Sequence, residues 1–474
     1  MSRVDTAWLR MDNDVNLMMI VGVWLLQPKV AYETLCNRVA EKLLKYERFR
    51  QVVVRDATGA AHWVADEDFD IHHHVVRDKL RRAKGQSERE ALQAKVGELA
   101  TTPLDPARPL WQFRLIESYE GGSALIARVH HCIGDGIALI SVMMTITDGG
   151  SDPPVRKRRA ATEADADGAD WLSEAVLKPL GGLSAKAADL VEASIARALD
   201  GLADPQKGIA SSIDGARTAA KVLGDVTAMA MMADDSPTLL KGKPSGRKRV
   251  AWGEPIPLEQ VKSIGKALGC SINDVLLASV SGAIGDWLRD QGDDPTGKEI
   301  RAMVPVNLRP LEQAWKLGNR FGLAPLVLPI GIDNPLARVY AVRARMNALK
   351  ASYQPLLAFA VLAVAGQLAK PLQDMILGLF ARKATAVMTN VPGPGVPLQF
   401  CGATLKQTMF WVPASGDIGV GVSILSYGGG VQFGLITDEA LCSDPQAIVD
   451  CFEPEFEKLL LLSMMLPWGG ESSL

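Results

Sequence analysis

Histidine and aromatic residues are scarce in this chain of 474 residues. Aromatic side chains make up 6% of it, and there are six histidines, none of them after residue 131. Imidazole is the side chain that most readily accepts a proton near neutral pH. A histidine general base can therefore lie only at one of six positions: His62, His72, His73, His74, His130 or His131.

An excess of basic charge is also missing. The chain has 51 Lys and Arg residues against 54 Asp and Glu residues, which gives a formal net charge of −3. A protein that binds nucleic acid usually carries a basic surface that neutralises phosphates. We therefore expect no nucleic-acid partner.

The cysteines form neither a metal site nor a disulfide framework. The six are scattered, with no C-x-x-C pair, and a chain of this length does not need disulfides to stabilise its core. We expect no bound metal and a reducing, cytoplasmic location. Cys132 lies next to His131, but neighbouring side chains on extended backbone point to opposite sides, so we do not expect it to be a nucleophile.

Signals for export and membrane insertion are absent as well. The N-terminal residues lack the basic and apolar stretches of a signal peptide. The longest apolar runs, at 17–26, 356–369 and 459–466, are shorter than the roughly 20 residues that span a bilayer. We therefore predict no transmembrane helix.

Strand-like and helix-like segments alternate along much of the chain. Short apolar runs mix with helical patterns in residues 1–150 and again in 241–474, which is typical of α/β domains. One hydrophobic core rarely grows beyond about 250–300 residues. We therefore predict an α/β fold with two domains, 1–150 and 241–474, joined by a linker and bridging helices at 151–240. In the second domain we predict strands at AMVPVNLRP, FGLAPLVLPI, KATAVMTNVPGP, IGVGVSIL and GGVQFGLIT, and helices near 271–290, 335–349 and 445–462.

Three consecutive histidines occur in the segment DFDIHHHVV, whose pattern favours a strand. Side chains alternate along a strand, so His72 and His74 would lie on one face and His73 on the other. Three ligands on opposite faces do not converge easily on one metal ion. We assign this run a structural or surface role.

His130 and His131 occupy a more informative position. They end the apolar strand SALIARV and precede Asp135 and Gly136, after which a helical pattern begins. A strand-to-helix turn with glycine presents side chains at a sheet edge, where α/β enzymes commonly carry catalytic groups. Imidazole can act as a general base if another group fixes its orientation, and Asp135 could do this directly or by holding the loop to an arginine. A purely structural role for the same residues is the alternative.

The spacing His130-His131-x-x-x-Asp135-Gly136 resembles the H-H-x-x-x-D-G signature of the CoA-dependent acyltransferase superfamily. Five further blocks in the right order resemble, more narrowly, the bacterial wax ester synthase/diacylglycerol acyltransferase family. They are PLW at 109–111, NDVLLA at 273–278, PVNLRP at 305–310, GNRFG at 318–322 and NVPGP at 390–394. The resemblance covers about residues 5–460 and is weakest between 151 and 240.

This resemblance implies two chloramphenicol-acetyltransferase-like domains joined by a helical crossover, with an active-site tunnel at their interface. It implies that His131, beside His130, takes the proton from an alcohol that attacks a fatty acyl-CoA thioester. It also implies that Asp135 faces away from the substrate and pairs with an arginine, for which Arg309 is our candidate.

Site-shaping roles are implied for three further residues. Gly136 closes the signature, and Asn273 and Asp274 form the family's N-D pair. We expect Asn273 to donate a hydrogen bond near the developing oxyanion. Alternatively, Asn273 is a helix N-cap, because it opens an apolar helical run.

The implied function is transfer of a long-chain acyl group from acyl-CoA to a fatty alcohol or diacylglycerol, giving wax ester or triacylglycerol and free CoA. No cofactor is expected, since CoA is part of the donor. A thioester is already activated, so direct attack needs no covalent acyl-enzyme. Consistently, the chain has no G-x-S-x-G nucleophile elbow.

Two other functions fit the same motifs. One is acyl transfer to another nucleophile, such as an amine, a polyketide hydroxyl or a short alcohol, and the other is lipid binding without turnover. Hydrophobic substrates also imply peripheral contact with the inner face of the membrane or with lipid inclusions. A basic run, consisting of Lys241, Lys243, Arg247, Lys248 and Arg249, could meet CoA phosphates or lipid headgroups, or could be a solvated loop.

Overall fold

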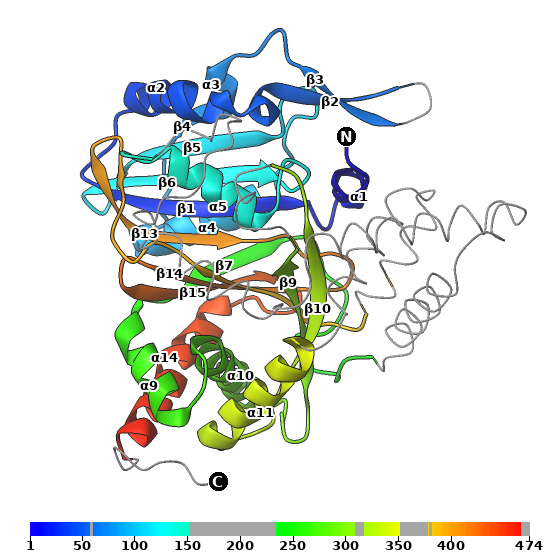
Figure 1. Ribbon diagram of the computed structural model, residues 1–474, viewed down its shortest axis with the longest axis vertical. Coiled ribbons are helices and arrows are strands. Elements are labelled where there is room, and N and C mark those ends of the chain that lie inside the picture. The colour runs from blue at the N-terminus through cyan, green and yellow to red at the C-terminus, as the bar shows by residue number, and fades with distance from the viewer. Residues whose placement is uncertain (57–59, 151–233, 309–316, 351–377, 379–381, 466–474) are drawn as a thin grey trace, which may run out of the picture.

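Two β-sheets lie across the middle of the molecule, with helices outside them (Figure 1). The computed structural model describes residues 1–474 except 57–59, 151–233, 309–316, 351–377, 379–381 and 466–474. Helices α2 (Tyr32–Lys42) and α3 (Ile71–His74) lie at one end of the view in Figure 1. The labelled helices of the second half lie at the other end. The predicted α/β class is confirmed.

The first sheet contains strands from both ends of the chain. Its order is β12-β13-β1-β6-β5-β4, and all neighbours are antiparallel except β4 and β5. The strands are β1 (Met19–Gln27), β4 (Val75–Asp78), β5 (Trp111–Tyr119), β6 (Gly122–His130), β12 (Gln399–Phe400) and β13 (Ala403–Trp411). Strand β13 pairs with β1 from Val21↔Trp411 to Gln27↔Thr404. The division of the sequence at 150 and 241 therefore does not coincide with the division into sheets.

Helices cover both faces of this sheet. Helix α4 (Glu88–Ala100) packs Leu92 and Val96 against one face. Helices α1 (Arg3–Met11), α2 and α5 (Gly136–Thr145) lie on the other face. Two 3-10 turns and a separate hairpin complete this half: Leu43–Lys45, Glu47–Arg50, β2 (Gln51–Arg55) and β3 (Ala61–Ala65).

Helix α1 was not among our predicted elements, yet its sequence explains it. The Ser2 side chain caps the helix by accepting a hydrogen bond from the Asp5 N–H at 3.0 Å. Four buried apolar residues recur at helical spacing: Val4, Ala7, Trp8 and Met11. Burial of this stripe in the core of the first half holds the helix against His131, which follows β6.

The second sheet has seven strands, with the order β10-β9-β11-β14-β15-β7 and β8 beside β15. They are β7 (Lys248–Trp252), β8 (Ile256–Pro257), β9 (Ile300–Asn307), β10 (Phe321–Leu328), β11 (Ala386–Pro392), β14 (Val420–Tyr427) and β15 (Gly430–Asp438). Helices α9 (Leu258–Leu268), α10 (Ile272–Asp290), α11 (Pro335–Lys350) and α14 (Pro445–Met464) pack on it. The strands and helices predicted for this half are confirmed within about two residues at most ends. Strand β13 was not predicted.

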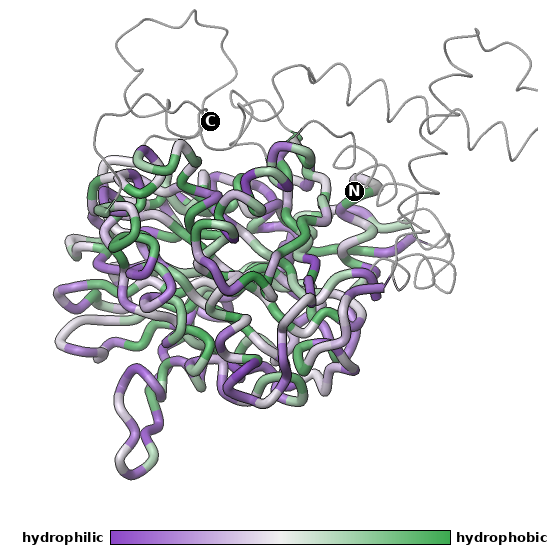
Figure 2. Tube along the Cα trace, turned by 90° about the horizontal axis from the view of Figure 1, so that it is seen from below, coloured by the Kyte–Doolittle hydropathy of each residue, from purple (hydrophilic) through white to green (hydrophobic). Residues whose placement is uncertain are grey.

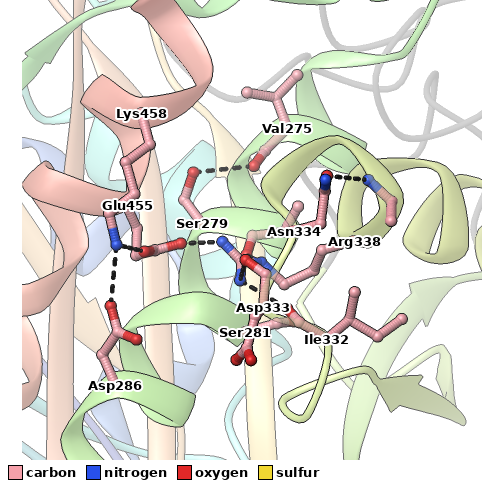
Figure 3. Close-up of polar contacts among 12 residues, drawn as sticks. Val275, Ser279, Ser281, Asp286, Ile332, Asp333, Asn334, Arg338, Glu455 and Lys458 are labelled. Atoms are coloured by element: carbon pink, nitrogen blue, oxygen red, sulfur yellow. Dashed lines mark hydrogen bonds and ion pairs between the residues drawn. The ribbon is translucent and has the colours of Figure 1, made fainter. Parts of the chain in front are cut away.

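Helix α10 runs through the core of the second half and borders a buried ion pair. Arg338 of α11 and Glu455 of α14 are 2% and 1% exposed, and a guanidinium N–H bonds the carboxylate (Figure 3). Arg338 also donates to the backbone oxygens of Ala278, at 3.0 Å, and Ile332, at 2.8 Å. These bonds satisfy the guanidinium and hold three helices together.

The distribution of hydropathy agrees with this layering. Seen from below, hydrophobic stretches fill much of the centre of the trace, and hydrophilic stretches lie mainly at outer turns (Figure 2). Within the described residues, no single helix is long and apolar enough to cross a membrane, although α9 and α10, bent by 101°, pass that test as a pair. The apolar run at 356–369 lies outside the described residues.

The predicted strand through the three histidines is wrong. Residues Ile71–His74 form a short helical turn, because the Asp70 side chain accepts a hydrogen bond from the His72 N–H at 2.9 Å and caps it. His74 is buried and stacks between Phe69 and Trp111. A structural or surface role for the three histidines stays our interpretation.

The basic run that leads into β7 and includes its first two residues lies among acidic partners. Arg247 and Arg249 contact Glu439, and Lys248 contacts Asp438 at 3.4 Å. Lys241 bonds the backbone oxygen of Ala384. Most of the basic side chains that we considered for phosphate binding are therefore paired with groups of the protein itself.

Candidate active site

The loop that carries the H-H-x-x-x-D-G motif is built at the end of β6. The His130 N–H donates to the Leu110 oxygen at 2.9 Å, and the His131 N–H donates to the Met18 oxygen at 2.7 Å. The PLW block therefore borders the first histidine, and the chain before β1 borders the second. These backbone hydrogen bonds fix the positions of the main-chain atoms from which the two imidazole side chains extend.

The imidazole of His131 lies in a closed, largely aromatic environment. Its side chain is buried, and its ring stacks on Trp8 of α1 with centroids 4.1 Å apart and planes 14° apart. Phe321 lies 5.4 Å away on the β10 side. Burial lowers the pKa of His131 to about 4, against a smaller opposing effect of its hydrogen bond to Asn319. The ring is therefore neutral near pH 7.

One hydrogen bond defines which nitrogen of His131 can act. Nδ1 lies 2.8 Å from Oδ1 of Asn319, and a carboxamide oxygen only accepts hydrogen bonds. The proton must then reside on Nδ1, which leaves the lone pair on Nε2. A neutral imidazole with a free Nε2 is the form required of a general base.

His130 faces different groups. Its Nδ1 accepts a hydrogen bond from the Cys132 N–H at 3.1 Å, and its Nε2 lies 3.4 Å from Oδ2 of Asp12. Nε2 makes no hydrogen bond with any described residue. These contacts tie His130 to the turn itself, so it positions the loop that carries His131.

Asp135 organises the loop at the start of α5. It is the N-cap of α5, where Oδ1 accepts from the Ala138 N–H at 2.9 Å. Oδ2 accepts from the Arg320 N–H at 3.0 Å, and the Asp135 N–H donates to Gly318. The carboxylate thus joins the signature loop to the GNRFG block. Its expected partner, Arg309, lies outside the described residues.

Two glycines lie at this junction, and the backbone requires glycine at one of them. Gly318 has φ +113°, a conformation that favours glycine, and it bridges to Gly134. Gly136 is the first residue of α5, and a Cβ there would meet no atom of the described residues within 4 Å. The space beside Gly136 borders the signature loop.

Asn273 and Asp274 lie at the start of α10. The N-cap is Ser271, whose side chain forms a capping box with Asp274. The alternative in which Asn273 caps the helix is therefore wrong, because the helix begins earlier. Oδ1 of Asn273 instead accepts from Asn390 at 2.8 Å, which joins the NDVLLA and NVPGP blocks. Its expected role near the oxyanion stays a prediction.

Three residues of this site received no role from sequence reasoning. Asn319 was noted only as part of a block, and Asp5 and Trp8 of α1 were not considered. Asp5 is 1% exposed and accepts from the N–H of Asn319 at 3.0 Å and from its Nδ2 at 2.8 Å. The N-cap and the apolar spacing of residues 2–11 could have predicted a helix there. They could not have predicted that this helix packs against His131.

Neither a metal nor a thiol nucleophile is indicated in this region. Within the described ranges, no group of three or more His, Cys, Asp or Glu residues could hold a metal ion. Cys132 is fully buried, and burial raises the pKa of its thiol well above the usual value. A thiolate at Cys132 is therefore disfavoured.

Comparison with known proteins agrees with the motifs. Residues 1–276 match the wax ester synthase/diacylglycerol acyltransferase catalytic domain, and residues 317–460 match the WS/DGAT C-terminal domain. The chain is 26% identical over 473 residues to the probable diacylglycerol O-acyltransferase tgs1 of Mycobacterium tuberculosis, covering 98% of this chain and 96% of that one. It is also 26% identical over 450 residues to tgs2, named in the same way, covering 91% and 92%.

Solved structures show the same fold. A wax ester synthase/diacylglycerol acyltransferase from Marinobacter aquaeolei VT8 aligns with a TM-score of 0.65 and 20% identity, covering 97% of this chain and 98% of that one. The first condensation domain of the calcium-dependent antibiotic synthetase aligns with a TM-score of 0.57 and 15% identity, covering 98% and 95%. The predicted two-domain, chloramphenicol-acetyltransferase-like fold is confirmed. With both family models matched in order along its length, this chain belongs to the wax ester synthase/diacylglycerol acyltransferase family.

Proposed function

We propose that this protein transfers a long-chain fatty acyl group from acyl-CoA to the hydroxyl of a fatty alcohol or diacylglycerol, with His131 as general base. The family supplies the reaction class, with an acyl donor and a lipid acceptor as substrates. The observation that carries the role of His131 is its bond from Nδ1 to Asn319 Oδ1, which leaves Nε2 able to accept a proton.

The reaction follows from this placement. Nε2 takes the hydroxyl proton while the alcohol oxygen attacks the thioester carbon, and the C=O becomes a tetrahedral oxyanion. When the C–S bond breaks, the CoA thiolate leaves and receives the proton from His131. The products are an ester and free CoA. No cofactor is required, because the thioester is already activated.

The test is release of CoA, followed with a thiol-reactive dye. Purified protein receives palmitoyl-CoA with hexadecanol, with dipalmitoylglycerol, or with a long-chain amine. We expect release that depends on an alcohol and that falls by about 10²–10⁴ in His131→Ala, the usual contribution of a general base. His62→Ala is the matched control, because His62 is exposed and pairs only with Asp56 among the described residues.

Two outcomes would overturn the proposal. CoA release that occurs with the amine but with neither alcohol would show that the acceptor nucleophile is different. Folded protein that binds palmitoyl-CoA but releases no CoA with any acceptor would be a lipid-binding homologue.

We also propose a cytoplasmic location with peripheral contact to the inner face of the membrane or to lipid inclusions. The support is chemical, because fatty alcohols and diacylglycerol partition into lipid and the acceptor must be drawn from there. Co-flotation with phosphatidylcholine vesicles that contain diacylglycerol tests this contact. Protein that stays at the bottom of the gradient with every vesicle composition would contradict it.

A further inference from the structure

A continuous chain of hydrogen bonds connects His131 to the N-terminal helix. Nδ1 of His131 bonds Oδ1 of Asn319 at 2.8 Å, and Nδ2 of Asn319 bonds Oδ1 of Asp5 at 2.8 Å. The backbone N–H of Asn319 donates to the same Asp5 oxygen at 3.0 Å. Three segments far apart in sequence therefore meet at one carboxamide.

The surroundings of Asn319 dictate which way its carboxamide points. Nδ2 also donates to the backbone oxygen of His131 at 2.7 Å, so two acceptors flank it. With the carboxamide reversed, its oxygen would face the Asp5 carboxylate and this backbone oxygen, which only accept hydrogen bonds. The observed orientation is therefore enforced, and Oδ1 is the atom presented to His131.

Asp5 contributes charge as well as hydrogen bonding. It is 1% exposed, and its Oδ2 makes no hydrogen bond with any described residue. The guanidinium of Arg48 forms an ion pair with this carboxylate, 3.6 Å from Oδ2, which is longer than a hydrogen bond. The carboxylate lies one residue removed from the imidazole. The part of its negative charge that Arg48 does not balance favours the cation that forms when the imidazole accepts a proton.

We propose that Asp5 is a positioning residue, which holds Asn319 so that His131 keeps its proton on Nδ1 and its lone pair on Nε2, and whose charge supports the imidazolium during acyl transfer. This inference rests on the proposed function for its effect on rate. Its effect on the tautomer is independent of any substrate. Helix α1 is then part of the site's machinery, through Asp5 at one turn and Trp8, stacked on His131, at the next.

The first measurement is the tautomer of His131 by ¹⁵N NMR of histidine-labelled protein. Only six histidines are present, and His131→Gln assigns the signal. We expect the Nδ1–H tautomer in the wild type. In Asp5→Asn, the new side chain can turn its own NH₂ toward Asn319, so the carboxamide can reverse and an Nε2–H population should appear. A wild-type signal from the Nε2–H tautomer would overturn the proposal, whatever the protein acylates.

The second measurement is steady-state kinetics of CoA release. Asp5→Asn should lower kcat by about 10–100-fold, less than or at most equal to the smallest loss expected on removing a general base, about 10², while KM for palmitoyl-CoA changes by less than about 2-fold. Asp14→Asn is the control, since it removes the same charge from an exposed residue beyond the end of α1. Unchanged kcat and tautomer in Asp5→Asn would overturn the role of Asp5.

A swap variant separates charge from mere packing. Asp5→Asn combined with Asn319→Asp keeps one carboxylate and one carboxamide in the chain of bonds but places the carboxylate next to His131. We expect it to recover part of the kcat lost in Asp5→Asn, because the two positions are coupled. The recovery should be incomplete, because one carboxylate oxygen at position 319 then faces the backbone oxygen of His131. A swap with no gain, alongside Asp5→Asn protein whose tautomer is unchanged, would show that Asp5 only supports the fold of this region.

Discussion

His131 is a basic side chain held where a positive charge is poorly tolerated. Its neutral form suits a general base, but burial also weakens it as a proton acceptor, since its pKa falls to about 4. The hydrogen bond to Asn319 offsets part of this effect on the pKa. Burial thus keeps this imidazole neutral, and Asn319, 188 positions away in the sequence, selects the nitrogen that carries its proton.

The lowered pKa of His131 predicts a loss of stability at acid pH. An unfolded histidine has a pKa near 6.5, so between about pH 6.5 and about pH 4 the unfolded chain binds more protons than the folded one. Folding therefore weakens as the pH falls through this window. His131→Gln cannot titrate and should lose about 2 kcal/mol less than the wild type between about pH 7.5 and about pH 5. Urea unfolding at both pH values measures this, and equal losses would contradict a buried neutral histidine.

At the scale of elements, helix α10 passes close to the ion pair between α11 and α14. A Cβ at Gly282 would collide with the Glu455 carboxylate and the Arg338 guanidinium. Glu455 also contacts Lys458, which reaches Asp286 at 3.3 Å (Figure 3). The absence of a side chain at one position thus permits a charged cluster between three helices.

Because the cluster is buried, we predict that removing its glutamate charge lowers the free energy of unfolding much more than removing the charge of an exposed glutamate. Glu455→Gln leaves Arg338 buried without a counter-charge, and it should lower the free energy of unfolding by about 3–5 kcal/mol. Glu259→Gln removes an exposed carboxylate paired with Lys262 and should cost less than about 1 kcal/mol. Thermal or urea unfolding compares them. Similar losses in both variants would contradict the account.

Gly282→Ala gives a second test of the same cluster. Replacing glycine by alanine in a helix normally stabilises it by roughly 1 kcal/mol. Here we expect a destabilisation of about 1–3 kcal/mol, because the added methyl overpacks the buried ion pair. A variant with an increased unfolding free energy would show that the helices can move apart at no cost.

At the scale of the molecule, strand β13 makes the two halves interdependent. It comes from the last quarter of the chain but pairs with β1 inside the first sheet. Packing between α4 and β7 joins the halves on one side of that sheet, with Val96 and Trp252 in the same cluster. The site uses the same junction, since Asn319 belongs to the second half and His131 to the first.

We therefore predict that residues 1–150 do not fold alone. Without β13, strand β1 becomes an exposed apolar edge, which favours aggregation. Expression of 1–150 should give insoluble protein, whereas co-expression with 234–474 should restore soluble protein that unfolds cooperatively. Soluble yield and circular dichroism report the outcome. A fragment 1–150 that unfolds cooperatively by itself would contradict this dependence.

Much of the fold was predictable because its signals are local. The apolar runs that became β9, β10 and β14 and the pattern that became α10 depend on spacing within a few residues. The strand predicted through His72–His74 failed where Asp70 caps a helical turn, a side-chain effect that competes with apolar patterning. Strand β13 went unpredicted because its polar positions, such as Lys406 and Gln407, break the apolar pattern.

The sequence by itself determined the class of fold, the family and the loop that bears His130, His131 and Asp135, because each depends on residue types at short, fixed spacings. Only the tertiary structure decided how His131 is prepared. Asp5 and Asn319 are 314 positions apart, and no local pattern brings them together. Their contact exists because β13 and the GNRFG block of the second half pack against β1, β6 and α1 of the first.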